Sequence, residues 1–186
     1  MSSDNSRKVN TPRARLSYPH LFEPQQYGEQ EPKYSCELLF EEGTDLSQLK
    51  AAVDVAIEEK WGNKPPKKLR LPFRDGDEKE DKDGYEGVTF IVARAKQQPG
   101  LVKGRTLEPV TDRNDIYGGC YVIANVTAFA YEHKQGGKGV SFALNHVLKV
   151  ADGERFGGEP QNASQVFESA DIDPAAFGDE VESNLI

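Results

Sequence analysis

The stretch CYVIANVTAFAYEHKQGGKGVSFALNHVLKV, residues 120–150, decides the fold class. In its first part, small apolar side chains occupy the even positions from Val122 to Ala130, and larger side chains occupy most odd positions from Tyr121 to Tyr131. Alternation with a period of two indicates a strand that turns one face to the core. The glycine-rich connection EHKQGGKG leads into a second alternating run, so the sequence predicts a hairpin of two strands, 120–131 and 140–150.

The same period predicts strands at residues 13–18, 33–40 and 87–96, with a Pro- and Gly-containing loop over 19–32. After the second strand the period becomes helical, and residues 45–61 are predicted as one α-helix that begins at Asp45 and ends before Gly62. Five strands and one helix predict a mainly β protein with a small Greek-key barrel. A β-sandwich stays open, because strand order is not readable from the pattern.

The composition indicates one soluble globular domain with tails. The chain has 186 residues, 37% of them hydrophobic and 29% charged. Its first ten residues contain no apolar run that would predict a signal peptide or a membrane anchor. Cys36 and Cys120 lack neighbours at metal-ligand spacing and are predicted to be core residues. We therefore expect a cytoplasmic protein without a cofactor, a metal or a membrane partner.

The net charge of −8 is unevenly distributed. Residues 151–186 contain nine acidic residues and one basic residue, so the rest of the chain is balanced. Beyond Gly157 the sequence is too polar to form a core of its own. The predicted organisation is a flexible N-terminus over 1–10, a barrel domain over 11–158 and a disordered acidic tail over 159–186.

Aromatic and basic side chains share the larger faces of two predicted strands. An aromatic ring stacks on any unpaired base, and neighbouring cations neutralise the phosphates, so this mixture is typical of a surface for single-stranded nucleic acid. Burial in the core is the alternative for each ring taken alone. The predicted stacking residues are Phe73, Phe90, Tyr121, Phe129 and Tyr131.

Basic residues also gather in the segment KPPKKLRLPFR, residues 64–74, with no acid between them. Such a segment either contacts phosphates or forms an ordinary solvated surface. The residues predicted to contact phosphate are Arg13, Arg15, Lys64, Lys67, Lys68, Arg70, Arg74, Arg94, Lys96, Lys103, Arg105, Lys134 and Lys138.

Six segments together resemble bacteriophage single-stranded DNA-binding proteins with an OB-fold: RARLSYPHLFEP, EPKYSCELLF, EEKWGNKPPKKLRLPFRDGDE, YEGVTFIVARAKQQPG, IYGGCYVIANVTAFAY and GKGVSFALNHVLKVADGERFGG. The resemblance implies a five-stranded barrel with a helix. It also implies a non-enzymatic protein that coats single-stranded DNA without sequence preference during phage replication, recombination or repair. The sequence leaves open whether the protein is a monomer or a homodimer.

An acidic tail in such proteins contacts replication or recombination partners and competes with DNA. The chain departs from this pattern in ending with ESNLI instead of an aromatic residue. The resemblance assigns the tail's partner contacts to Asp171, Asp173, Phe177, Asp179, Glu180 and Glu182.

Two other function classes are compatible with parts of the sequence. A metal-dependent nuclease would use the acidic cluster of residues 75–83, which contains Asp75, Asp77, Glu78, Glu80, Asp81 and Asp83, yet this charged segment is predicted to be a solvated loop. His20 in a loop, His133 near the hairpin turn and His146 on the presumed core face suggest no triad. A protein-interaction module would explain the tail but not the coincidence of aromatic and basic residues.

Overall fold

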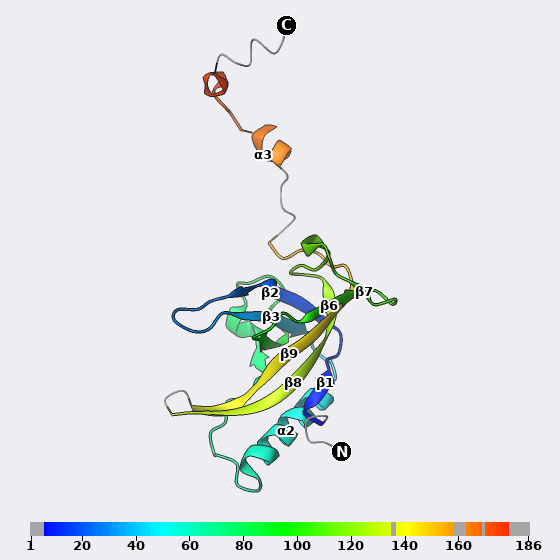
Figure 1. Cartoon of the computed structure of the whole chain (residues 1–186), viewed down its shortest axis with the longest axis vertical. Helices are drawn as coiled ribbons and strands as arrows, with labels where there is room; N and C mark the ends of the chain where they lie inside the picture. Colours follow the sequence, from blue (N-terminus) through cyan, green and yellow to red (C-terminus); the bar gives the residue numbers. More distant parts are fainter. Residues whose placement is uncertain (1–5, 135–136, 158–162, 169, 179–186) are drawn as a thin grey trace.

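The computed structural model describes residues 6–134, 137–157, 163–168 and 170–178 (Figure 1). Its strands are β1 (Lys8–Asn10), β2 (Ala14–Gln25), β3 (Lys33–Phe40), β4 (Arg74–Asp75), β5 (Thr89–Ala95), β6 (Gly100–Lys103), β7 (Glu108–Pro109), β8 (Tyr121–His133) and β9 (Gly137–Ala151). Its α-helices are α2 (Ser47–Trp61) and α3 (Ala163–Glu168). Short 3-10 turns η1 (Gly76–Lys79), η2 (Arg113–Asp115) and η3 (Pro174–Phe177) complete the described elements.

Five strands close into a barrel in the order β8, β2, β3, β5, β9, with β9 pairing back onto β8. Neighbours are antiparallel except β5 and β9, which run parallel. Closure gives every barrel strand two neighbours, which is the arrangement of an OB-fold. The predicted barrel is therefore confirmed, and the open alternative of a sandwich is wrong.

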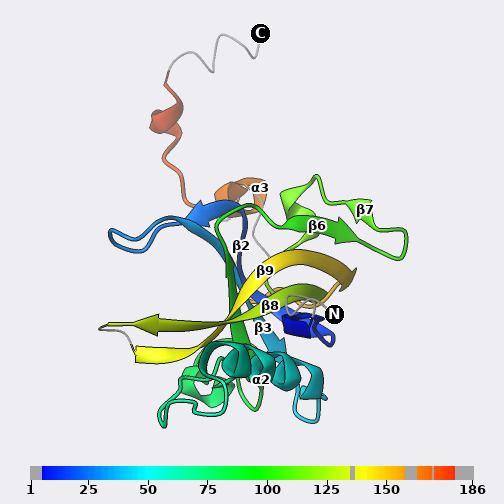
Figure 2. The ribbon, with the colours of Figure 1, turned by 60° about the horizontal axis from the view of Figure 1, so that its bottom comes forward.

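The barrel interior is filled by the small faces that the alternation predicts. The side chains of Val122, Ala124, Val126 and Ala128 on β8 are fully buried. Figure 2 shows α2 lying across one end of the barrel, where Leu49, Ala52, Val53 and Ala56 join the same core. The helix ends as predicted at Gly62, whose backbone N–H donates to the Glu58 carbonyl at 2.8 Å. Its start falls two residues later than expected, because Asp45 forms a turn by accepting from the Ser47 N–H.

Two segments predicted to be irregular are paired strands instead. Strand β2 continues to Gln25, although the sequence predicts a loop from residue 19. Its pairing with β3 shifts register after Ser17 and again after His20, and Tyr18 has a positive φ of 45°. Such bulges let a strand hold prolines without breaking the sheet. At the N-terminus, Lys8–Asn10 forms β1 against β8 where a flexible segment was predicted, and residues 1–5 lie outside the described part.

The part of the chain beyond Gly157 is described over residues 163–168 and 170–178 (Figure 1). Its described residues form α3 and η3, and the phenylalanine rings Phe167 and Phe177 are 62% and 61% exposed. The disordered acidic tail over residues 159–186 stays a prediction. Asp179, Glu180 and Glu182 lie outside the described residues. No helix in the described part of the chain has the length and apolarity to cross a membrane.

Candidate nucleic-acid interface

A groove of about 1110 Å³ crosses the outer face of the barrel. Strands β8 and β9 form its floor, and Figures 1 and 2 show their hairpin extending beyond the barrel. The end of β5 and its turn into β6 line the groove further, together with the β2–β3 loop and Arg70. The groove is therefore built on paired strands, which hold side chains in fixed positions.

Phe129 and Tyr131 present their rings to this groove from β8. Phe129 is 38% exposed, which is unusual for a ring held on a strand. The Tyr131 ring lies 5.1 Å from the His133 ring at an interplanar angle of 30°. Gly139 makes room for it, because a Cβ on that glycine would stand 2.7 Å from the Tyr131 hydroxyl. The rings thus follow one another along β8 on the outside of the barrel.

Three predicted cations lie in the same groove: Arg94, Lys96 and Arg70. Arg94 and Lys96 come from β5 and the residue after it, and both are exposed. Arg70 is fixed by its backbone, whose N–H donates to the Lys138 carbonyl and whose carbonyl accepts from the Val140 N–H, both at 3.0 Å. Aromatic and basic groups therefore meet on one surface, as expected for these five residues.

A bulge in β9 adds two groove residues that the sequence analysis missed. Asn125 of β8 pairs with His146, whereas the next residue, Val126, pairs with Leu144, so Asn145 is an extra residue. Leu144 and Val147 both point inward, and Asn145 and His146 both line the groove. The prediction that His146 faces the core is wrong for this reason. The spacing of three between buried Leu144 and Val147 was the available signal.

Two predicted stacking residues pack against the protein itself: Phe90 is buried and Phe73 is partly buried. Phe90 is fully buried with Leu39 and Tyr85, because the segment after β4 folds over the outside of β3 and β5. Its ring lies 5.3 Å from that of Tyr85, edge to face, and the Lys79 ammonium lies 5.2 Å from its centre. Phe73 packs edge to face on Phe142 at 6.1 Å. Their prediction as stacking residues is not supported by this placement.

Tyr121 lies outside the groove, in a cluster with two arginines. The Arg13 guanidinium lies 4.2 Å from the centre of the Tyr121 ring. Arg15 donates to the carbonyls of Gly119 at 3.1 Å and Glu154 at 2.6 Å, so it ties β2 to the segment after β9. The Tyr121 ring and the two guanidinium groups therefore make their contacts within the protein: Arg13 through a cation–π contact and Arg15 through hydrogen bonds to the backbone.

Several other predicted phosphate contacts form ion pairs. Arg74 pairs with Glu78 at 3.0 Å, Lys138 with Glu132 at 2.9 Å, and Lys103 with Asp115 at 2.6 Å. The hydrogen bond to Asp115 raises the pKa of Lys103 above its usual value. The remaining predicted contacts are exposed and do not line the groove: Lys64, Lys67, Lys68, Arg105 and Lys134.

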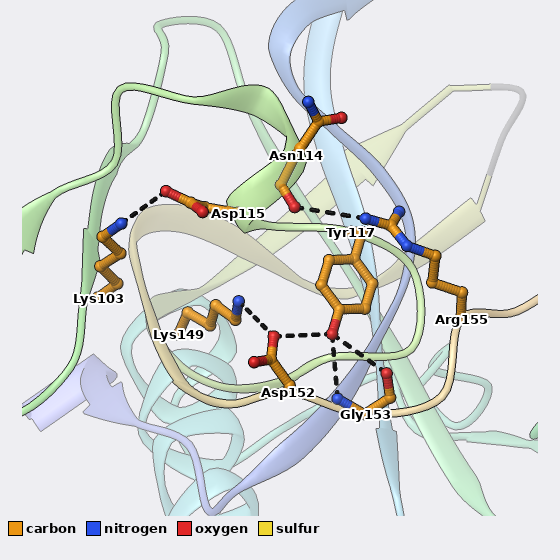
Figure 3. A network of polar contacts seen from close by, with 8 residues as sticks. All are labelled: Lys103, Asn114, Asp115, Tyr117, Lys149, Asp152, Gly153 and Arg155. Atoms are coloured by element: carbon orange, nitrogen blue, oxygen red, sulfur yellow. Dashed lines mark hydrogen bonds and ion pairs between the residues drawn. The ribbon is translucent and has the colours of Figure 1, made fainter. Parts of the chain in front are cut away.

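Figure 3 shows how Lys103 and its neighbours belong to a network at the end of β9. The Tyr117 hydroxyl donates to Asp152 at 2.8 Å, and the Lys149 ammonium pairs with the same carboxylate at 2.7 Å. Both bonds lower the pKa of Asp152, and the bond from Lys149 has the larger effect. The Arg155 guanidinium lies 4.0 Å from the Tyr117 ring centre. The network fixes the segment from which the chain leaves the barrel towards its C-terminus.

Three carboxylates of the acidic cluster of residues 75–83 accept hydrogen bonds from backbone N–H groups. Asp75 accepts from the Asp77 N–H at 3.0 Å, Asp77 from the Gly87 N–H at 2.8 Å, and Asp83 from the Gly157 N–H at 2.9 Å. Within the described ranges, no three His, Cys, Asp or Glu side chains gather closely enough to hold a metal ion. The nuclease alternative therefore gains no geometric support from this cluster.

Comparisons with known proteins agree on one family. The family described as Enterobacter phage Enc34, ssDNA-binding protein, matches residues 7–177. Protein p50 of Acyrthosiphon pisum secondary endosymbiont phage 1 is 39% identical over 164 residues, which cover 81% of this chain and 87% of p50.

Solved structures give the same result. The single-stranded DNA-binding protein of bacteriophage Enc34 in complex with ssDNA is 28% identical, with a TM-score of 0.69 over 83% of this chain and 94% of that one. Its C-terminal truncation is 31% identical, with a TM-score of 0.65 over 84% and 95%. Bacteriophage T7 gp2.5, at 15% identity and a TM-score of 0.55 over 89% and 96%, shares the fold. The resemblance seen in the sequence is confirmed, and the chain belongs to the Enterobacter phage Enc34 ssDNA-binding protein family.

Proposed function

We propose that this protein binds single-stranded DNA in the β8–β9 groove and coats it without sequence preference. The observation that carries the proposal is the meeting of Phe129 and Tyr131 with Arg70, Arg94 and Lys96 on one surface. Family membership supports it, as does the relative from phage Enc34 that was solved with ssDNA.

The chemistry of the groove suits unpaired bases. Each stacked base contributes roughly 1–3 kcal/mol, and stacking tolerates all four bases because every base has a π-face. A duplex hides those faces inside its own stack. Phe129 and Tyr131 are two residues apart on one strand, so they point to the same side of β8 and offer successive rings to one strand of DNA.

The cations supply the electrostatic part of binding. Arg94 on β5 and Lys96 directly after it line the same groove as the rings of β8. Exposed Lys64, Lys67 and Lys68 precede Arg70 in the chain and are proposed to contact phosphates beyond the groove. Each neutralised phosphate of a single strand releases counterions and contributes about −0.7 to the slope of log affinity against log salt.

The proposed biological setting is phage DNA replication, recombination and repair, and the C-terminal segment has two proposed roles there. Tethered anions near a cationic groove compete with DNA at high effective concentration. Exposed Phe167 and Phe177, with Asp171 and Asp173 close to them in the sequence, also offer partner proteins an apolar and acidic contact.

The decisive experiment compares salt slopes for two double variants of the full chain. Binding of a labelled oligo-dT is measured by fluorescence anisotropy from low to high salt, with Mg²⁺ present so that any cleavage is also seen on a gel. Arg94→Gln with Lys96→Gln should lower the magnitude of the slope by about 1.4, that is, by two phosphates. Lys50→Gln with Lys82→Gln is the matched control, since both lysines are exposed and line no part of the groove. Equal slopes for both double variants would refute the proposed site, and cleavage without a stable complex would refute the proposed function.

A further inference from the structure

A second hollow of about 550 Å³ adjoins the groove and shares Asn145 and His146 with it. It lies over β1, β6, β8 and β9, and its described lining contains no Phe, Tyr or Trp. Its volume falls within the roughly 300–1,000 Å³ of small-molecule sites. A DNA strand that continued past the aromatic residues of the groove would enter this hollow. No large aromatic ring is available there for stacking, so a base in the hollow would need a different kind of contact.

A row of amides crosses the hollow from strand to strand. The Asn125 Nδ2 donates to Asn10 Oδ1 at 2.8 Å, and the Asn145 Nδ2 donates to Asn125 Oδ1 at 2.9 Å. The Asn145 Nδ2 also donates to the Thr127 hydroxyl at 2.9 Å. The bulge in β9 is what turns Asn145 outward to complete this row. Three paired strands therefore fix the orientation of one amide.

The Oδ1 of Asn145 is the one polar atom of its side chain that remains available for a hydrogen bond within the described structure. Both hydrogens of its Nδ2 are used, and an amide oxygen is an acceptor only. Among the hydrogen bonds of the described residues, none uses the Asn145 Oδ1, and this atom is not buried without a partner. A preorganised acceptor thus stands at the junction of the groove and the second hollow.

We propose that the second hollow is a base-edge subsite, in which the Asn145 Oδ1 accepts a hydrogen bond from the Watson–Crick edge of one unpaired base. This inference rests on the proposed function. Every base carries a donor on that edge: N3–H in thymine, N4–H₂ in cytosine, N6–H₂ in adenine, and N1–H with N2–H₂ in guanine. A single acceptor therefore tolerates any sequence, whereas in a duplex the same donors are taken by the complementary strand.

The subsite also has a place for the backbone of that nucleotide. Lys8 lines the same hollow, is exposed, and lies on β1 opposite Thr127. An ammonium at that edge neutralises the phosphate next to the bound base. The predicted contact is polar throughout, so it complements the stacking contacts of Phe129 and Tyr131 without adding sequence preference.

A double-mutant cycle tests the subsite with thymidine probes. Affinities of the full chain and of Asn145→Ala are measured for oligo-dT and for the same oligonucleotide built from N3-methylthymidine, which lacks the only Watson–Crick donor of thymine. Steric effects of the methyl groups away from residue 145 cancel in the cycle, so the coupling reports whether the Asn145 side chain faces N3 of a bound thymine. A hydrogen bond of ordinary strength gives a coupling of about two- to twelvefold. Asn114→Ala, whose side chain lines neither hollow, is the matched control and should show none.

The outcomes separate this inference from the proposed function. Failure of the unmodified chain to bind oligo-dT would overturn the proposed function itself. Normal binding of oligo-dT with the same methylation penalty in Asn145→Ala as in the unmodified chain would overturn the subsite alone. If Asn145→Ala does not fold, Thr127→Val replaces it, because this variant keeps the shape of residue 127 and removes the hydroxyl that holds the amide. A methylation penalty in Thr127→Val equal to that of the unmodified chain would then count against the preorganised acceptor.

Discussion

Two phenylalanines on outward positions of two barrel strands should respond differently to the same truncation. Phe129 on β8 is 38% exposed and lines the groove, whereas Phe90 on β5 is 0% exposed beneath the segment that carries Tyr85. Both were predicted from the sequence to stack on bases. We expect Phe129→Ala to change DNA affinity and Phe90→Ala to change the free energy of unfolding.

The magnitudes follow from these two environments. Phe129 loses one stacking contact, about 1–3 kcal/mol, which weakens binding by about 5- to 150-fold. Its partial exposure leaves little stability to lose. Phe90 loses a fully packed ring, its edge-to-face contact with Tyr85 and its contacts with Lys79 and Arg74. Removal of a buried Phe costs about 3–5 kcal/mol, and this lowers Tm by about 6–20 °C in a domain of this size.

Two measurements on each variant separate the effects. Thermal or urea denaturation followed by circular dichroism gives the change in stability. Anisotropy titration with oligo-dT, at a temperature where both variants are folded, gives the change in affinity. Each phenylalanine serves as the matched control of the other, because the substitution is the same. A Phe129→Ala variant that binds oligo-dT normally, or one as destabilised as Phe90→Ala, would refute the assignment of Phe129 to the groove.

Three further predictions concern the rest of the chain. Deleting the residues from Gly158 onward should tighten oligo-dT binding, most clearly at low salt, where the tail's anions are least screened; unchanged affinity in an anisotropy titration would argue against competition. Burial raises the pKa of the Cys36 thiol to about 12, so this thiol should resist a thiol-specific reagent at pH 8 in the native protein and react on unfolding, and rapid native labelling mapped to it would contradict its burial. The folded-state pKa of Asp152 lies below the unfolded value of about 3.9, so its bonds stabilise the fold above that pH and are lost as the pH falls through the folded pKa. Asp152→Asn should therefore reduce the loss of stability at acidic pH, measured by urea denaturation at a series of pH values. The same loss in the variant as in the unmodified chain would show that the Asp152 carboxylate of Figure 3 contributes nothing to this pH dependence.

The barrel was predictable because each of its five strands carries a periodic signal over part of its length. The alternation in β8 is strict from Val122 to Ala128, and all four even positions are buried. The helix was predictable for the same kind of reason, since its apolar stripe and Gly62 are local features. Local patterns specify elements, and the small number of strands left few ways to close them.

The groove was predictable only in part, because exposure depends on what covers a strand. Phe90 follows the same alternation as Phe129, yet the segment with Tyr85 packs over it from outside the barrel. The alternation within β5 cannot show that another segment of the chain packs over its outer face. The β9 bulge shows the converse: one extra residue, Asn145, reverses the faces of the strand after it, so a strict alternation misplaces His146.

The distribution of ion pairs explains how a chain with a net charge of −8 presents a surface for a polyanion. Outside the groove, several cations are paired with acids beside them: Lys79 pairs with Glu37 at 3.0 Å and Lys149 with Asp152 at 2.7 Å. In the groove, Arg70 and Arg94 form no ion pair with any described residue. The Lys96 ammonium forms one long, exposed ion pair, at 3.7 Å from the Glu31 carboxylate. Potential at a surface depends on nearby uncompensated charge, because distant exposed charges are screened within about 10 Å. The balance that matters is therefore that of the groove, which is positive, and not that of the chain.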